Sequence, residues 1–468
     1  MLTYSLNSSS KIPLYEQLYT SIKKDILKGR LLAHEKLPSK RNLSKHLGIS
    51  VVTIESSYQQ LQAEGFIYSL PKKGFFVSKI HLQKIHTQKK IRLDSVSETR
   101  SVLPRTELNL SHHQIDPETF PFATWSRLLR SVLNENQEKL VDVSPSQGIL
   151  SLRQAIAEHL NAYRGMAVDP QQIIIGAGTD YLYLLLIQLL GANKTVAIED
   201  PGYPKIRKIY EQFNVHFQPV PVNEDGIDLE ILNQSKADIV HISPSHQFPT
   251  GSILPISKRY ELLAWASQKE NRYIVEDDFD SEFRFIGKPL PSLQEIDHSD
   301  KVIYINTFSK SLVSTLRISY MILPPQLLPL FKERLSFYAN TVSNLEQYTL
   351  AKFIKEGYFE KHLNRMRIYY QKKRDYFINQ LKESSLSKKI SIVNSSSGLH
   401  FILHIKTIIP EEEICQRAIE QGLSITPVTS FYHRDNQTWP HCFVVNYSNI
   451  KKDDVKKIIT ILDNILQD

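Results

Sequence analysis

Cysteine is almost absent from this chain. Only Cys415 and Cys442 occur among its 468 residues, so the sequence offers neither a disulfide framework nor a cysteine-based metal cluster, and we expect no metal site. So low a cysteine content is typical of a protein that works in a reducing compartment, which predicts a cytoplasmic location.

Long apolar runs are lacking as well. The most apolar stretch, residues 181–190, is too short to cross a bilayer and contains Gln188, so we interpret it as a buried helix. The first ten residues are polar and lack the apolar segment of a signal peptide. The sequence therefore predicts a globular protein of two or three domains with no membrane partner.

Positive charge is concentrated at one end of the chain. The net charge is +8, and residues 1–80 hold 12 Lys and Arg against 5 Asp and Glu. Residues 81–100 hold 5 against 2, which leaves the rest of the chain nearly neutral. A basic front end joined to a near-neutral body indicates contact with a polyanion, with an ordinary solvated basic surface as the alternative.

The residue pattern divides the chain into three parts. We expect an N-terminal domain over residues 11–79, a basic linker without apolar periodicity over 80–106, and a second domain over 107–468. The second domain alternates apolar strands with helical stretches, which is typical of an α/β fold with a large, mostly parallel sheet. A small C-terminal α+β unit is expected after the Ser- and Lys-rich residues 382–397. The expected strands are 173–175, 195–198, 239–242, 273–275 and 302–305.

The N-terminal domain has the spacing of a helix-turn-helix. Ser39 and Ser50 can each cap a helix, and Gly48 can make the turn between the two helices. A hairpin with a basic tip follows over residues 66–77 and can serve as a wing. In the recognition helix we expect an apolar inner face of Ile54, Tyr58 and Leu61 and an outer face of Thr53, Ser56, Ser57 and Gln60.

The segments LPSKRNLSKHLGIS and TIESSYQQLQAEGFIYSLPKKGFFV resemble the winged helix-turn-helix of the GntR family. Val51 stands where the family often has Arg, so the base contact usually made by that Arg is not expected here. The resemblance implies binding to double-stranded DNA, and together with the outer helix face it indicates DNA contacts by Ser39, Arg41, Thr53, Ser57, Lys73 and Gly74.

Three segments of the second domain carry reactive side chains. The strand at 273–275 runs into Asp277, the strand at 302–305 runs into hydroxyls and Lys310, and Arg317 follows seven residues later. Open α/β sheets bind ligands at the carboxyl ends of their strands. Pyridoxal phosphate needs a lysine for a Schiff base, a carboxylate for its ring nitrogen, and hydroxyls, an arginine and a helix N-terminus for its phosphate. The glycine-containing residues 176–179, directly before an apolar helix, can supply that N-terminus.

The segments GAGT, EDPGYP, PSHQFPTG, VEDDFDSEFRF and NTFSKSL resemble fold-type I aminotransferases, and in particular the MocR/GabR subfamily, in which a GntR-type winged helix precedes an aminotransferase-like domain. The resemblance implies that Lys310 forms the Schiff base, that Asp277 binds the ring nitrogen and that Tyr203 packs beside the ring. It also implies a head-to-tail homodimer on an operator with two half-sites. The phosphate would be held by Gly178, Thr179, Thr307, Ser309 and Arg317.

Several positions differ from those of a working aminotransferase. Phe248 replaces an Asn that bonds the cofactor, and Phe279 replaces a tyrosine. Val444 stands where an arginine would grip the substrate carboxylate, although Arg434 lies nearby in the sequence. Val143 stands where a partner subunit would lend a tyrosine. These losses predict that cofactor binding is retained while turnover of amino acids is weak or absent.

The sequence therefore predicts a transcription regulator that depends on pyridoxal phosphate. Its second domain would sense the cofactor itself, an amine or an amino acid through Lys310. Two alternatives remain open. One is an aminotransferase with an accessory DNA-binding domain, and the other is a regulator whose second domain is only a dimerisation scaffold.

Overall fold

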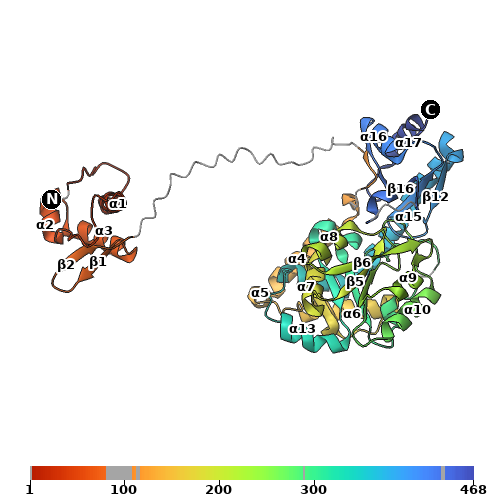
Figure 1. Cartoon of the computed structure of the whole chain (residues 1–468), viewed down its shortest axis with the longest axis horizontal. Helices are drawn as coiled ribbons and strands as arrows, with labels where there is room; N and C mark the ends of the chain where they lie inside the picture. The colour runs from red at the N-terminus through yellow and green to blue at the C-terminus, as the bar shows by residue number, and fades with distance from the viewer. Residues whose placement is uncertain (1–2, 81–107, 112–115, 288–289, 434–437, 468) are drawn as a thin grey trace. The chain divides into compact units, whose positions relative to one another are not determined.

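The computed structural model describes residues 3–80, 108–111, 116–287, 290–433 and 438–467. The chain divides into two compact units, residues 1–101 and residues 102–468 (Figure 1). Among the described helices, none is long and apolar enough to cross a membrane.

The N-terminal unit consists of three helices and a hairpin. Each helix turns its apolar residues toward one shared core, and Leu18, Leu43, Ile54, Tyr58 and Leu61 are completely buried there. The winged helix-turn-helix predicted from the sequence is therefore confirmed. Its elements are α1 (Leu14–Leu27), α2 (Lys40–Leu47), α3 (Val51–Ala63), β1 (Ile67–Leu70) and β2 (Gly74–Val77).

Local hydrogen bonds set the turn between α2 and α3. The Ser50 hydroxyl accepts a hydrogen bond from the Thr53 N–H at 3.1 Å, which caps the first turn of α3. Gly48 ends α2 with a φ of 66°, a conformation that side chains with a Cβ disfavour. An ion pair of 2.6 Å between Lys40 and Glu55 joins the two helices. These contacts hold α3 in a fixed orientation against α2.

The larger unit is organised around an eight-stranded sheet with the order β4-β11-β10-β9-β8-β5-β6-β7. β11 runs antiparallel to both of its neighbours and β7 runs antiparallel to β6, while the other pairs are parallel. The five expected strands are present, and β6, β7 and β11 are additional. The bounds are β4 (Ile173–Gly176), β5 (Thr195–Asp200), β6 (His216–Asn223), β7 (Gly226–Ile227), β8 (Ile239–Ile242), β9 (Tyr273–Asp277), β10 (Val302–Thr307) and β11 (Ser319–Ile322).

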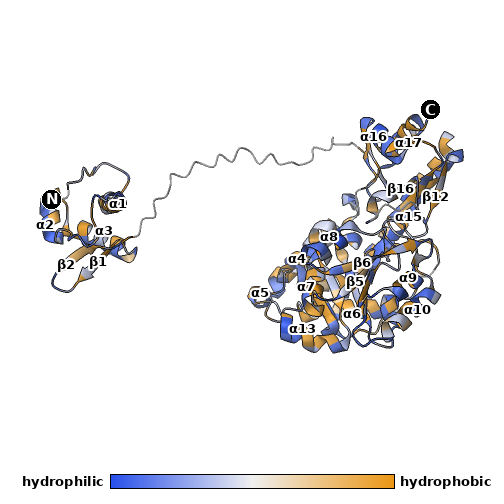
Figure 2. Ribbon diagram, in the orientation of Figure 1, coloured by the Kyte–Doolittle hydropathy of each residue, from blue (hydrophilic) through white to orange (hydrophobic). Residues whose placement is uncertain are grey.

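Helices cover both faces of this sheet. Ile174 of β4 packs toward the helices of one face, whereas its neighbours Ile173 and Ile175 pack toward those of the other. Burial on both faces explains why these strands are apolar throughout, and α7 is hydrophobic along much of its length (Figure 2). One face carries α7 (Thr179–Leu190), α8 (Pro204–Gln212) and α13 (Leu328–Leu335), and the other carries α6 (Leu150–Arg164), α9 (Leu229–Gln234), α10 (Ile256–Ser267) and α14 (Asn344–Lys355). Shorter or more peripheral helices are α4 (Phe122–Glu135), α5 (Gln137–Val141), α11 (Leu293–Ile296) and α12 (Phe308–Ser311).

A smaller α+β subdomain completes this unit, as expected from the sequence. Its antiparallel sheet has the order β12-β13-β16-β15. Its core also contains Leu108 and Leu110, because β3 (Leu108–Asn109) pairs in parallel with β14 (Leu423–Ser424). The first described residues of this unit therefore pair with a strand of the small subdomain that lies more than three hundred residues later in the chain. The remaining elements are α15 (Tyr358–Glu383), β12 (Ile390–Val393), β13 (His400–Ile405), α16 (Glu411–Glu420), β15 (Thr426–Pro427), β16 (Cys442–Asn446) and α17 (Lys452–Ile465).

Candidate cofactor site and DNA interface

Lys310 lies just beyond the carboxyl end of β10, on the short helix α12. The Thr307 hydroxyl accepts hydrogen bonds from the Ser309 N–H at 3.1 Å and from the Ser319 hydroxyl at 2.8 Å, so it fixes the turn that presents the lysine. Burial lowers the pKa of the Lys310 amine to about 8. A lowered pKa leaves more of the amine neutral and nucleophilic near neutral pH.

Asp277 ends β9, and the described residues provide a hydrogen bond to only one of its two carboxylate oxygens. Tyr183 of α7 donates a hydrogen bond to Oδ2, and Nε2 of His241 lies 3.9 Å from the same atom. Oδ1 is buried without a hydrogen-bond partner in the part of the chain that the structure describes. An unpaired buried acceptor is costly, and a protonated ring nitrogen is a suitable donor for it.

Gly178 and Arg317 lie together in another part of the site. α7 begins after Gly178, which has a φ of 90°, and a Cβ at this position would lie only 2.4 Å from Nη2 of Arg317. The guanidinium also pairs with Asp180 at 3.2 Å. The first N–H groups of a helix have no partner within the helix, so α7 and Arg317 together can hold a phosphate.

One cavity of about 370 Å³ brings most of the predicted cofactor residues together. Gly178 itself does not line this cavity, but the next residue, Thr179, does. A smaller cavity of about 50 Å³ shares Tyr203 and Phe248 with the larger one and is also lined by Arg207 and His433. Arg317 and the N-terminus of α7 form an anion cradle for a phosphate. Together with the Lys310 amine and the unpaired Oδ1 of Asp277, this cradle fits pyridoxal phosphate. The predicted residues that line the larger cavity are Thr179, Tyr203, Asp277, Thr307, Ser309, Lys310 and Arg317.

An apolar wall occupies the positions where an aminotransferase would carry polar side chains. Phe248 and Phe279 both line the cavity, and the Phe248 ring centroid lies 5.9 Å from that of Tyr203. Val444 is buried with Phe248 in one apolar cluster, so it presents no cation to a carboxylate. Arg434 lies outside the described residues.

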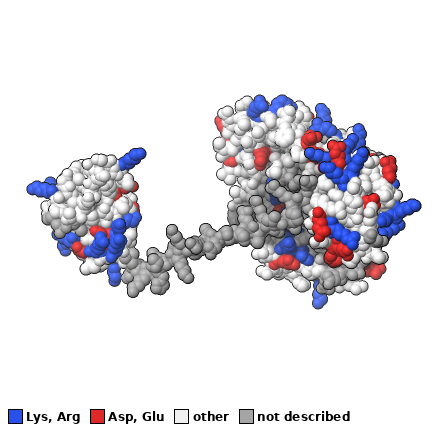
Figure 3. Space-filling model, turned by 90° about the horizontal axis from the view of Figure 1, so that it is seen from above, with Lys and Arg blue, Asp and Glu red and all other residues white. Residues whose placement is uncertain are grey.

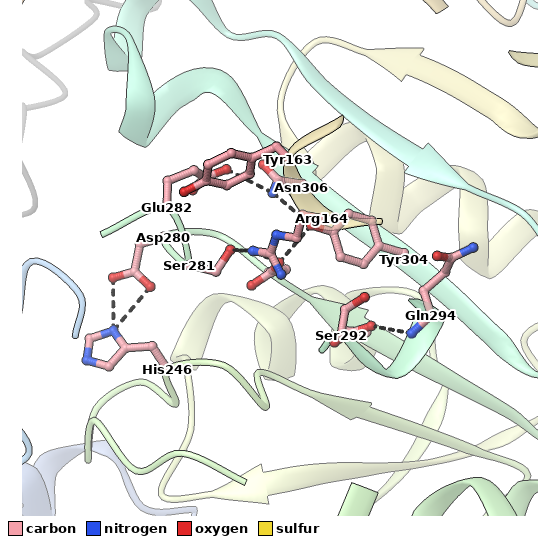
Figure 4. Close-up of polar contacts among 12 residues, drawn as sticks. Tyr163, Arg164, His246, Asp280, Ser281, Glu282, Ser292, Gln294, Tyr304 and Asn306 are labelled. Atoms are coloured by element: carbon pink, nitrogen blue, oxygen red, sulfur yellow. Dashed lines mark hydrogen bonds and ion pairs between the residues drawn. The ribbon is translucent and has the colours of Figure 1, made fainter. Parts of the chain in front are cut away.

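A buried polar network lies beyond Asp277 (Figure 4). Arg164 of α6 pairs with Asp278 at 2.7 Å, and the Tyr304 hydroxyl donates a hydrogen bond of 2.7 Å to the same carboxylate oxygen. Nδ1 of His246 lies 2.9 Å from a carboxylate oxygen of Asp280. These contacts fix the segment that follows β9. The sequence motif contains both acids, but it does not reveal partners that come from distant segments.

Most of the predicted DNA contacts lie on the surface of the N-terminal unit. Ser39, Arg41, Lys73 and Gly74 are exposed and Thr53 is half-buried. Lys and Arg side chains project from several places on the face of this unit seen in Figure 3, and some acidic side chains lie among those of its lower part. An exposed basic surface of this kind can follow a phosphate backbone.

The prediction for Ser57 is wrong. This side chain is completely buried, and its hydroxyl donates a hydrogen bond to the Tyr15 carbonyl at 2.7 Å, which joins α3 to α1. Ser57 follows Ile54 by three residues and precedes Leu61 by four, and residues at these spacings share one face of a helix. Ser57 therefore stabilises the domain from the inside.

Comparison with known families agrees with both parts of this description. Residues 14–77 match the family described as bacterial regulatory proteins, gntR family, and residues 109–462 match aminotransferase class I and II. The fold and the matches define a DNA-binding winged helix-turn-helix followed by an aminotransferase-like domain whose cofactor is pyridoxal 5′-phosphate.

Sequence similarity to other regulators extends over nearly the whole chain. It is 37% identical over 461 residues to the uncharacterized HTH-type transcriptional regulator YdeL of Bacillus subtilis (strain 168), covering 97% of both chains. It is 32% identical to the probable rhizopine catabolism regulatory protein MocR of Rhizobium meliloti, covering 92% of this chain and 90% of that one. The kynurenine aminotransferase of Pyrococcus horikoshii shares the fold of the second domain, with a TM-score of 0.67, 23% identity, and coverage of 77% of this chain and 92% of that chain. The chain belongs to the MocR-type transcription regulators of the GntR family.

The pKa of Lys310 leads to a pH-dependent prediction. Only a neutral amine can react with an aldehyde, so the rate at which pyridoxal phosphate becomes covalently attached should rise as pH increases through about 8 and then level off. The rate is measured by mixing apoprotein with pyridoxal phosphate and following the visible absorbance. Asp280 raises the pKa of Lys310, so Asp280→Asn should move the midpoint to lower pH. A midpoint close to that of free lysine, about 10.4, would contradict the assignment.

Gly178 provides a steric test of the anion cradle. Gly178→Ala should weaken pyridoxal phosphate binding by about tenfold or more, because the added Cβ displaces the Arg317 guanidinium. Affinity is measured by equilibrium titration. Gly422→Ala is the matched control, because Gly422 also has a positive φ of 82° but has nothing within 4 Å of an added Cβ. Equal effects of the two substitutions would mean that backbone strain, and not the lost cradle, is responsible.

Proposed function

We propose that this regulator senses its effector at Lys310. The effector is pyridoxal phosphate itself, or a small amine or amino acid that reacts with the lysine-bound cofactor. The observation that carries the proposal is the unpaired, buried Oδ1 of Asp277 in the same cavity wall as the Lys310 amine. A buried acceptor without a partner is costly, so this position suits a donor that a bound ligand supplies.

The side chains around the cavity have separable roles. When bound, the cofactor supplies an aldehyde for amines and an electron-withdrawing ring. Lys310 would provide the amine that holds it, and Asp277 would keep a proton on the ring nitrogen. Tyr183 donates a hydrogen bond to Asp277 and thereby leaves the other carboxylate oxygen for the ring. Arg317 balances the charge of the phosphate.

The apolar wall favours a sensor over a catalyst. A carboxylate-binding arginine acts through two parallel, charge-assisted hydrogen bonds, and Val444 can make neither. Phe248 and Phe279 cannot donate hydrogen bonds to the cofactor or substrate. The alternative of an aminotransferase with an accessory domain therefore requires another group for substrate binding. Any transamination by this protein is expected to be slow.

A homodimer, arranged head to tail, is part of the proposal. The described residues 122–150 expose several large apolar side chains, and a group of such side chains often marks a surface that another subunit covers. Two winged helices in one dimer would read an operator with two half-sites. Effector binding that changes the closure of the small subdomain would change the spacing of the two winged helices. The protein would act in the cytoplasm. The large apolar side chains that residues 122–150 expose, and that the second subunit would cover, are Phe122, Leu133, Val141, Val143 and Leu150.

Lys310→Ala tests the sensing role directly. The variant should lose the visible absorbance of the covalently attached cofactor, and its DNA affinity should no longer respond to pyridoxal phosphate. Both are measured on the full chain, with thermal unfolding as the check on folding. Lys205→Ala is the control, because Lys205 also lines the cavity and pairs with Asp180, yet has no covalent role in the proposal. An unchanged response of DNA binding in Lys310→Ala would disprove sensing at this lysine, and rapid multiple-turnover transamination by the wild type would favour the enzyme.

Arg41→Ala tests the division of labour between the two domains. Removing this exposed cation at the start of α2 should weaken operator binding by about tenfold and reduce its salt dependence, with no change in cofactor content. Arg30→Ala removes the same charge from the same unit outside α2 and α3 and should have a smaller effect. Equal losses in the two variants would indicate a general charge effect and no specific contact by Arg41.

A further inference from the structure

The recognition helix α3 begins with two apolar side chains in solvent. Val51 is 41% exposed and Val52 is 70% exposed, directly after the capping residue Ser50. The apolar residues later in the helix, such as Ile54 and Tyr58, are completely buried. The core of the domain therefore does not account for the two valines, and their side chains remain available to a partner.

The polar side chains near these valines also make contacts within the domain. The Thr53 hydroxyl lies 2.8 Å from the Ser50 hydroxyl, and Glu55 pairs with Lys40 at 2.6 Å. Ser56 donates a hydrogen bond to the Val52 carbonyl at 3.1 Å. The start of α3 thus presents a mainly apolar surface, although in helix-turn-helix proteins this end of the recognition helix contacts base edges in the major groove.

Thymine is the base whose major-groove edge suits such a surface, because its C5-methyl group accepts apolar contacts. Guanine presents two acceptors there, and a valine would leave both without a donor. Valine is also stiff about χ1, so its methyl groups lose little conformational entropy on binding. The chemistry of the two valines therefore selects against guanine and in favour of thymine.

We infer that Val51 and Val52 read thymine methyl groups, so that each operator half-site carries thymine where it meets the N-terminal turn of α3. The inference rests on the DNA-binding function proposed above and adds a specificity to it. An Arg at position 51, as the GntR family often has, would suit guanine, whereas valine offers only an apolar contact to a methyl group.

The test removes methyl groups from the DNA. An operator is first selected from randomised duplexes with the full-length protein, and each thymine is then replaced in turn by deoxyuridine, which lacks only the methyl group. At one or two positions in each half-site the dissociation constant, measured at fixed salt, should rise about fourfold per methyl. Replacement elsewhere in the duplex should have little effect.

Variants assign the effect to the two side chains. Val51→Ala and Val52→Ala should each abolish the deoxyuridine penalty at one position while binding the unmodified operator more weakly. Both side chains are exposed and alanine favours helices, so thermal unfolding should be unchanged. Leu32→Ala is the matched control: Leu32 is 67% exposed in the same unit but lies outside α3, and the penalty should persist. Val51→Arg should shift the selected base toward guanine.

The outcomes separate this inference from the function on which it rests. Tight operator binding with no deoxyuridine penalty at any position would overturn the reading of thymine and leave DNA binding intact. A penalty that persists in both valine variants would also overturn it. If the full-length protein selects no duplex at all, the proposed operator binding fails together with the inference.

Discussion

The parallel pairing of β9 with β10 is the constraint on which the cofactor site depends. Its register places Ile305 opposite Asp277, so both strands end at the same edge of the sheet, and Lys310 follows within one short helix. β11 runs in the opposite direction, and its first residue, Ser319, pairs with Thr307 and with Gly176. An antiparallel strand begins where its parallel neighbours end. This reversal brings Arg317 to Gly178, although more than a hundred residues separate them in the sequence.

The sequence predicts these strands unequally. Strands β4, β5, β8, β9 and β10 are apolar runs buried on both faces, and such runs are easily recognised. β11 has the same length and burial as β4 and β8, so its apolar residues Tyr320, Met321 and Ile322 carry a signal that the predicted strands did not include. The pairing of β3 with β14 joins residues more than three hundred positions apart, and no local pattern contains that information.

The candidate site was predictable where one motif carries the chemistry and not where tertiary contacts decide it. Asp277, Lys310 and Arg317 could be identified because each lies near a strand end in a recognisable order. Tyr183 lies within an apolar helix and His241 within an apolar strand, and only the fold brings both to Asp277. A histidine inside such a strand is a usable signal, because a buried imidazole needs a polar partner. Ser57 was misplaced because its hydroxyl suggested an outer face, whereas its helical position makes it an inner residue.

The short strand β3 has a mechanical consequence. β3 pairs with β14 of the small subdomain and not with a strand of the large sheet. The Leu108 N–H donates a hydrogen bond to the Gly422 carbonyl at 3.2 Å, and the Leu110 N–H donates one to the Ser424 carbonyl at 2.9 Å. Residues 108–111, the first described residues of the larger unit, are therefore held by the small subdomain. Any tilt of that subdomain carries residues 108–111 with it, so the point at which the described chain of this unit begins moves with the small subdomain and not with the large sheet.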